Sequence, residues 1–279
     1  MDWHDCCIVR LWVKGIRPAT RKKTGGCFKS KMKGVVIRME NISYIGLSQQ
    51  VALHRLMEVT ANNMANMNTP GFKAQHVLFG EYLNKTQETG KEKISQVLSS
   101  GSYRNMDQGS LTHTSNQLDL AVQGDGYFAV QTPSGVKYTR AGSFALNDKG
   151  EIVTKTGDQV LSDAGNPLTV PPGAAQITVV EDGTISSEKG SVGKLKLVTF
   201  RNPQAVVPVG NNLYEAPAIQ ETPVDKPHVA QGMIENSNVQ PILEMNKMIE
   251  ILRRYQSAQN ILMTDHERIR GAIQRLSKV

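Results

Sequence analysis

One helical pattern and its abrupt end decide the fold, and this end reads Ala61-Asn62-Asn63-Met64-Ala65-Asn66-Met67-Asn68-Thr69-Pro70-Gly71-Phe72-Lys73. The pattern opens near Ile42, and its apolar residues recur at three- and four-residue spacing, which places them on one face of a helix. Thr69-Pro70-Gly71 then ends the helix, because proline moves the preceding residue out of the α region and glycine permits a turn. The apolar face consists of Leu53, Leu56, Met57, Met64 and Met67.

The positive charge of the chain is concentrated at its start. The 279 residues carry a formal net charge of +7, but residues 1–38 hold ten Lys/Arg and two Asp/Glu, so the remainder is close to neutral. We therefore expect no basic groove for nucleic acid outside this segment. Residues 1–38 also hold all three cysteines and both tryptophans, so the rest of the chain needs no disulfide and offers no cysteine to a zinc site.

The start of the chain is a poor secretory signal. Its apolar run, Cys6–Val13, is interrupted by charge before it reaches a useful length. No other run approaches the ~18 apolar residues of a transmembrane helix, so we expect no membrane span. We interpret residues 1–38 as a basic extension, either a disordered segment or the product of a start assigned upstream of the true one, and we favour the second interpretation.

The middle of the chain changes from helical to strand-like patterning. Residues 75–117 contain one short apolar cluster followed by a polar stretch, and we interpret them as a connector. From Leu118 apolar and polar residues alternate, and turn signals such as Gly124-Asp125-Gly126 recur at short intervals. This pattern predicts antiparallel hairpins, with the strands ending near Tyr214 and residues 216–228 forming a proline-rich linker.

A final helix is predicted within residues 231–279. It begins after Asn236-Ser237-Asn238, where Ser or Asn is expected to cap the first turn, and Pro241 is compatible with a helix start. Its residues follow a heptad with one apolar row and one mixed row. The pattern alone leaves two alternatives, a coiled-coil seam or an amphipathic helix packed on its own β domain. The apolar row is Met248, Tyr255, Leu262, Ile269 and Leu276, and the mixed row is Met245, Leu252, Gln259, His266 and Ile273.

Three stretches of the chain resemble the flagellar axial proteins, the rod and hook family. The first is the Ala61–Lys73 string, which matches the family signature Ala-Asn-Asn-(apolar)-Ala-Asn-(apolar)-Asn-Thr-Pro-Gly-Phe-Lys at every position. The similarity covers about residues 39–279, and the run that starts at Met39 is most similar to the proximal-rod type. The other stretches are Leu118–Phe128 with Tyr138–Phe144, similar to the family's core strands, and Gly232–Val239 with Glu244-Met245 and Arg254-Tyr255, similar to its terminal helix region.

The resemblance implies a structural subunit that polymerises into the rod, a tube that crosses the periplasm and transmits torque. Its implied partners are other rod proteins, further copies of itself and the flagellar type III export apparatus, which exports such subunits without a cleaved signal peptide. No cofactor, no nucleic acid and no insertion into a membrane are implied. Two alternatives stay open, a distal-rod or hook-type axial subunit and a secreted β-rich module that binds carbohydrate or peptidoglycan.

The sequence contains no enzyme signature with the context that its chemistry requires. Gly124–Ala129 matches the pattern G-x-G-x-x-A, but Pro133-Ser134-Gly135 follows it where a dinucleotide site needs a helix. The six histidines are scattered without ligand spacing, and no P-loop or G-x-S-x-G string occurs. We therefore predict that the chain is not an enzyme and has no catalytic, cofactor-binding or metal site.

These observations predict an α+β fold, in which N- and C-terminal helices pair as a coiled-coil-like assembly domain and the middle forms a mainly antiparallel β domain. The predicted parts are the N-terminal helix and turn at 39–74, the connector at 75–117, the β domain at 118–230 and the C-terminal helix at 231–279. Asn62, Asn63, Asn66 and Asn68 are expected to bond backbone groups where the helix ends, and with Thr69, Pro70, Gly71 and Phe72 they form the family motif. The candidate assembly interface is Leu53, Leu56, Met64, Met67, Leu252, Tyr255, Leu262 and Ile269.

Overall fold

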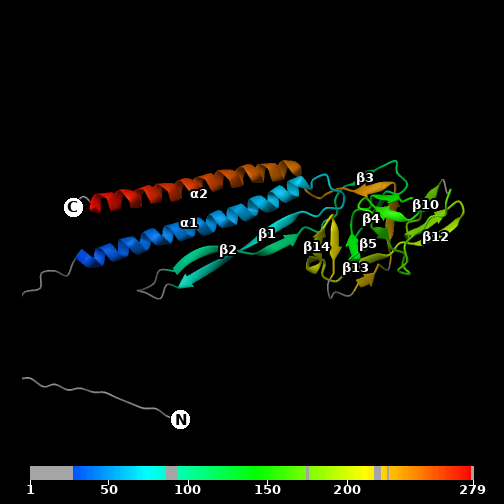
Figure 1. Cartoon of the computed structure of the whole chain (residues 1–279), viewed down its shortest axis with the longest axis horizontal. Coiled ribbons are helices and arrows are strands. Elements are labelled where there is room, and N and C mark those ends of the chain that lie inside the picture. Colours follow the sequence, from blue (N-terminus) through cyan, green and yellow to red (C-terminus); the bar gives the residue numbers. More distant parts are fainter. Residues whose placement is uncertain (1–27, 86–92, 174–175, 217–220, 225, 278–279) are drawn as a thin grey trace, which may run out of the picture. The chain divides into compact units, whose positions relative to one another are not determined.

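The computed structural model describes residues 28–85, 93–173, 176–216, 221–224 and 226–277 (Figure 1). The chain divides into two compact units at the boundary between Asn41 and Ile42, and the contacts described below all lie within the second unit. Of the predicted extension at 1–38, residues 1–27 lie outside the described residues, and helix begins at Phe28. Within the described residues, no helix is long and apolar enough to cross a membrane.

Two long helices come from the two ends of the sequence (Figure 1). Helix α1 spans Phe28–Ala65 and helix α2 spans Pro241–Leu276. Pro241 occupies the first turn of α2, where its missing N–H costs nothing. The predicted Ser or Asn cap is wrong, because the N-cap residue is Gln240 and no side chain caps the helix. Asn236 and Asn238 instead bond to the segment around residues 105–112.

The segment predicted as a connector contains a long antiparallel hairpin. Strand β1 (Gln75–Lys85) pairs with β2 (Lys93–Arg104), and a bulge interrupts the register between Leu78 and Phe79. The polar composition of β2 conceals this strand from a periodicity argument, since its few apolar residues are spaced irregularly among Ser, Gln and Gly. Two-stranded sheets are marginally stable alone, so this hairpin needs packing partners.

The remaining strands form the β domain, and all their pairings are antiparallel. The largest sheet has nine strands, a second sheet has the order β10-β11-β12, and β4 pairs with β17 while β3 pairs with β18. A short 3-10 helix, η1, spans Pro203–Ala205. The strands are β3 (Leu111–His113), β4 (Leu120–Gln123), β5 (Tyr127–Thr132), β6 (Gly135–Thr139), β7 (Phe144–Leu146), β8 (Ile152–Thr154), β9 (Gln159–Val160), β10 (Ile177–Val179), β11 (Thr184–Ser187), β12 (Gly190–Lys194), β13 (Leu197–Phe200), β14 (Val207–Gly210), β15 (Leu213–Glu215), β16 (Glu221–Pro223), β17 (His228–Gln231) and β18 (Met233–Glu235).

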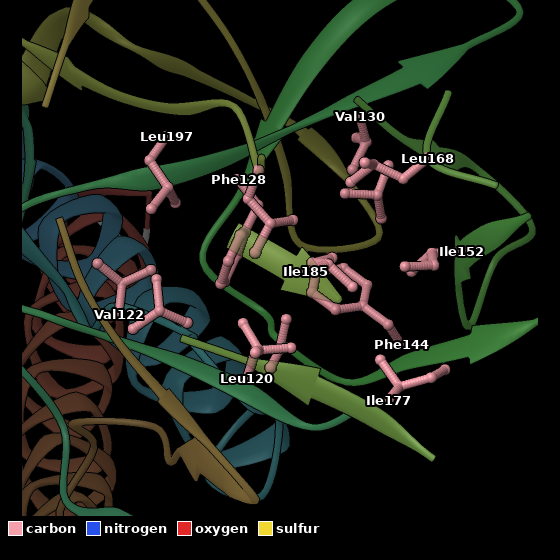
Figure 2. Packing of buried hydrophobic residues seen from close by; sticks show 14 of the residues in the cluster. Leu120, Val122, Phe128, Val130, Phe144, Ile152, Leu168, Ile177, Ile185 and Leu197 are labelled. Carbon is pink, nitrogen blue, oxygen red and sulfur yellow. The ribbon is translucent and has the colours of Figure 1, made fainter. Parts of the chain in front are cut away.

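Strand β5 is buried on both faces, and its alternating side chains enter two different cores. Phe128 and Val130 belong to the larger core, whereas Tyr127 and Ala129 belong to the second one. In the larger core the ring of Phe128 meets the ring of Phe144 edge-on at 5.1 Å between centroids. Figure 2 shows these aromatic rings among the aliphatic side chains of the surrounding strands.

The predicted end of the β region is wrong. Residues 216–228 were expected to form a linker, yet β16 pairs with β13, and β17 pairs with β4. Pro223 misled the prediction, because β16 pairs only with β13, and a strand at the edge of a sheet tolerates proline. The two strand pairs β4·β17 and β3·β18 bring the end of the β domain back to its beginning.

Candidate functional site at the junction of helices and strands

The three stretches singled out in the sequence meet at one buried ion cluster. Lys73 follows the turn after α1, Arg140 follows β6, and Glu235 ends β18. Lys73 Nζ lies 2.7 Å from Glu235 Oε1, and Arg140 Nε lies 2.6 Å from Glu235 Oε2. The three side chains are 3%, 4% and 1% exposed, in the order Lys73, Arg140, Glu235. One carboxylate therefore joins segments from the beginning, middle and end of the sequence.

Backbone groups complete the hydrogen bonding of this cluster. Lys73 Nζ donates to the carbonyl of Asp107 at 2.8 Å, and the N–H of Gly109 donates to Glu235 Oε1 at 3.1 Å. The guanidinium of Arg140 donates to the carbonyls of residues 122, 124 and 126. Burial lowers the pKa of the Lys73 ammonium, and the hydrogen bond to Glu235 opposes this shift. A buried charge is stable only when its donors and acceptors have hydrogen-bond partners. Here backbone groups of the surrounding loops are those partners, so the cluster holds these loops in place.

At Gly71 and Gly142 another backbone segment lies too close to leave room for a side chain. Gly71 has φ +70°, and a Cβ there would lie 2.6 Å from the backbone carbon of Arg140. Its N–H donates to the carbonyl of Glu235 at 2.8 Å. A Cβ on Gly142 would lie 1.5 Å from the carbonyl oxygen of Leu120. Only glycine fits at either position without backbone movement.

Asn238 joins three segments with one side-chain amide. Its Oδ1 accepts from the N–H of Ala74 at 2.7 Å, and its Nδ2 donates to the carbonyls of Asn105 and Asp107, each at 3.0 Å. Asn236 donates to the hydroxyls of two residues of the same region. The C-terminal motif is thus bonded both to the residues after α1 and to the end of the β1–β2 hairpin.

The motif asparagines occupy different environments. Asn63 is 1% exposed, and its amide makes two bonds with the backbone of Gln75, each at 2.9 Å. Asn66 Nδ2 donates to the carbonyl of Asn62 at 2.9 Å, whereas Asn68 is exposed. The turn that follows is held from the β domain, because Asn212 Nδ2 donates to the carbonyl of Pro70 at 2.5 Å. Thr69 donates to Asn66 Oδ1, and Phe72 is half-buried.

Helices α1 and α2 contact each other in antiparallel order. The end of α1 meets the start of α2 where Asn63 lies 3.4 Å from Glu244, and further along Ser43 lies 3.4 Å from Asp265. A Cβ on Gly46 would lie 2.6 Å from Cδ2 of Leu262. The buried row of α2 consists of Glu244, Ile251, Ala258 and Asp265, and its half-buried companions are Met248, Tyr255, Leu262 and Ile269.

The mixed heptad row was predicted as the companion row of a coiled-coil seam, and within the subunit it does not face α1. Met245, Leu252 and Ile273 of this row are exposed by 53%, 40% and 61%. The row that does face α1 starts one residue earlier, at Glu244. Its first and last residues carry carboxylates, so a search for apolar residues at heptad spacing does not detect it. Among the predicted assembly residues, Leu53 is buried, Met67 and Leu252 are exposed, and the half-buried ones are Leu56, Met64, Tyr255, Leu262 and Ile269.

The ion cluster of Lys73, Arg140 and Glu235 was not predicted as a site. Each residue lies inside one of the stretches that carry the family resemblance, and that coincidence was the available signal. Sequence spacing gives no sign that residues 162 positions apart, Lys73 and Glu235, share a bond.

Comparison with known proteins places the chain in a class. Residues 44–73 match the family model described as flagella basal body rod protein. Residues 121–187 match the model for the flagellar hook protein FlgE/F/G D1 domain, and residues 230–275 match that for the flagellar basal body rod FlgEFG protein C-terminal. The fold and these three ranges define a flagellar axial protein of the hook and rod class.

Individual relatives narrow the assignment within that class. The chain is 38% identical to the flagellar basal-body rod protein FlgF of Caulobacter vibrioides over 244 residues, which cover 86% of this chain and 100% of the relative. It is 35% identical to FlgF of Mesorhizobium japonicum, over 78% of this chain and 90% of the relative. Identity to FlgG of Bacillus subtilis is 32%, over 80% of this chain and 94% of the relative. The chain belongs to the flagellar basal-body rod proteins of the FlgF type, and it is a structural subunit of the rod.

Proposed function

We propose that this subunit polymerises into the proximal rod through its terminal helices, which pair as a coiled-coil-like assembly domain in the wall of the tube. The antiparallel contacts between α1 and α2 support this pairing. In this proposal the ion cluster of Lys73, Arg140 and Glu235 keeps the assembly helices and the β domain in a fixed arrangement. A fixed joint is what a shaft that transmits torque requires.

The observation that carries the proposal is a second apolar face on α2, beside the face that contacts α1. Its apolar members recur at helical spacing and are each at least 40% exposed. A soluble monomer rarely leaves an apolar stripe of this kind uncovered, so neighbouring subunits are the natural cover. The stripe consists of Ile242, Met245, Ile249, Leu252, Met263 and Ile273.

Helix α1 and the β1–β2 hairpin add exposed apolar side chains to the proposed interface. On α1, Tyr44, Leu47 and Val51 are exposed by 59%, 55% and 63% at three- and four-residue spacing. On the hairpin, Leu78 and Tyr82 lie on one face of β1 and are exposed by 49% and 55%. The proposed assembly residues therefore divide into an intrasubunit group, centred on Leu53, Leu56, Met64, Tyr255, Leu262 and Ile269, and an intersubunit group that includes Met67 and Leu252.

We further propose that the flagellar type III apparatus exports the chain without a cleaved signal peptide, and that the assembled subunit lies where the rod crosses the periplasm. Its partners are then other rod proteins and further copies of itself, with no nucleic acid, no cofactor and no insertion into a membrane. Its role is mechanical rather than catalytic.

Replacement of Leu252 by Glu tests the intersubunit face. The added charge would be buried between subunits without a partner, which costs several kcal/mol per contact. We expect Leu252→Glu to abolish motility and rod assembly while secretion and the thermal transition of the free subunit stay unchanged. Ser257→Glu is the matched control, because Ser257 is exposed on α2 and is not three or four residues away from any member of the stripe. Normal swimming of the Leu252→Glu strain would refute the proposed interface.

A further inference from the structure

The surface between α1 and α2 contains carboxylates at positions where helix seams normally hold apolar side chains. The buried row of α2 falls at seven-residue spacing, and Glu244 and Asp265 at its ends are 5% and 6% exposed. Ile251 and Ala258 between them are no more buried, at 7% and 5%. Buried carboxylates contribute little net stability even when they are paired, so these two call for another explanation.

Glu244 faces a donor that is also held by a backbone segment outside the two helices. Asn63 Nδ2 donates to the carbonyl of Gln75, and Asn63 Oδ1 accepts from the N–H of Gln75. These two hydrogen bonds set the orientation of the amide plane. Asn63 Nδ2 also donates to Glu244 Oε2, at 3.4 Å. Lys247 Nζ, on the rim of the seam, lies 2.6 Å from Glu244 Oε1.

Asp265 repeats this construction three heptads further along α2. Ser43 Oγ donates to Asp265 Oδ2 at 3.4 Å, and Arg268 Nη2 lies 2.6 Å from Asp265 Oδ1. Each carboxylate thus has a base three residues later on its own helix and a short polar side chain on α1. Between the two ends, the close approach of Leu262 to Gly46 is a third contact in the same register.

We propose that Glu244 and Asp265 are register-determining residues, which select one alignment of α2 on α1 against alignments shifted by a heptad. A shift by one heptad in one direction would place Glu244 beside Leu56, and a shift in the other direction would place Asn63 beside Ile251. Either shift breaks the hydrogen bond between Asn63 and Glu244 and leaves a buried polar group against an apolar side chain, and the pocket beside Gly46 would lose Leu262. Polar residues at single seam positions specify register in this way, at some cost in stability.

The consequence for the rod is a single alignment of the paired helices. Where many similar helices pack together, an all-apolar seam would accept shifted alignments. Two polar contacts at a fixed separation accept only one alignment. This inference rests on the proposed pairing of α1 with α2 within one subunit, and the test below separates the two.

Disulfide trapping in the full chain tests the register, because only Cys6, Cys7 and Cys27 must first be replaced by serine. Gly46→Cys with Leu262→Cys reports the native register, since a Cβ at Gly46 lies 3.1 Å from Cγ of Leu262. Gly46→Cys with Tyr255→Cys, or with Ile269→Cys, reports a shift by one heptad in either direction. We expect the native pair alone to close in the unsubstituted background. With Glu244→Leu and Asp265→Leu, we expect the shifted pairs to close about tenfold faster, which corresponds to ~1.4 kcal/mol of lost discrimination.

The matched control replaces two exposed carboxylates of α2, Glu250→Leu with Glu267→Leu, and thereby makes the same change of charge away from the seam. Leucine at 244 and 265 is compatible with a helix seam, so the thermal transition of the β domain should be preserved. Failure of the native pair to close in the unsubstituted background would overturn the pairing itself. Two results would overturn the register role alone. In one, the native pair closes but the shifted pairs close no faster in Glu244→Leu/Asp265→Leu. In the other, the control variant shows an equal increase in the closure rate of the shifted pairs.

Discussion

Lys73 and Glu235 form an ion pair 2.7 Å long although 162 residues separate them, and both side chains are almost fully buried. The same carboxylate also holds Arg140, so two cations depend on one anion. One buried carboxylate therefore ties the N-terminal motif, the β domain and the segment before α2 to one another.

Removal of the shared carboxylate should be strongly destabilising. Glu235→Gln leaves the charges of Lys73 and Arg140 buried without a counter-charge, and breaking a buried pair in this way costs about 3–5 kcal/mol. Urea unfolding followed by circular dichroism measures the loss. The control is Glu250→Gln, whose partner Arg254 is 65% exposed, so little change is expected. Equal midpoints for the two variants would show that the cluster contributes nothing to stability.

Gly71 should tolerate no side chain. Alanine at this position adds the cost of a positive φ, about 1–2 kcal/mol, to the collision of its Cβ with the backbone of Arg140, an overpacking cost of about 1–3 kcal/mol. Gly157 separates the two effects, because it has φ +90° and open space around its Cβ position. Thermal melting should therefore show a clearly larger loss for Gly71→Ala than for Gly157→Ala. A similar loss in both would mean that the backbone at Arg140 yields.

Gly46 in α1 and Gly271 in α2 should respond differently to alanine. Nothing lies within 4 Å of a Cβ on Gly271, so Gly271→Ala should stabilise α2 by up to about 1 kcal/mol. Gly46→Ala makes the same gain in helix propensity, but its Cβ forces Leu262 to move. We expect the helical signal to melt later in Gly271→Ala and to melt earlier, or no later, in Gly46→Ala. A gain of equal size at both sites would contradict the close contact of α1 with α2.

The β domain should lose stability in alkali through Tyr214. Burial raises the pKa of the Tyr214 hydroxyl from 10.0 to about 12, with a smaller contribution from Tyr127. Because the folded-state pKa is raised, the stabilising contribution is complete below pH 10 and is lost as the pH rises towards 12. A shift of this size corresponds to roughly 2–3 kcal/mol.

Tyr214→Phe removes this titration, so its unfolding free energy should fall less steeply between pH 10 and 12 than that of the unsubstituted protein. Tyr82→Phe serves as the control, because Tyr82 is 55% exposed. Identical slopes for Tyr214→Phe and the unsubstituted protein would show that the ring of Tyr214 is open to solvent.

The sequence by itself determined the order of the parts and the family. The Ala61–Lys73 string sets the end of α1, because Pro70 and Gly71 act on their own backbone and immediate neighbours. Alternation after Leu118 correctly predicted antiparallel strands, since a strand buried on one face has a period of two. Of the apolar row predicted from Met248 to Leu276, the members up to Ile269 are half-buried on one helical face and Leu276 is exposed, because side-chain direction in a helix follows from residue number but burial does not.

Tertiary structure alone decided which groups meet. The sequence of β16 contains a proline and suggested a linker, but its pairing with β13 makes it a strand. Leu252 and Ile251 are neighbours of equal hydrophobicity, yet one is exposed and the other buried, because the position of α1 selects the face. Lys73, Arg140 and Glu235 are ordinary charged residues until folding removes water from all three. Their pairing depends on distances between segments remote in sequence, and local backbone preferences do not encode such distances.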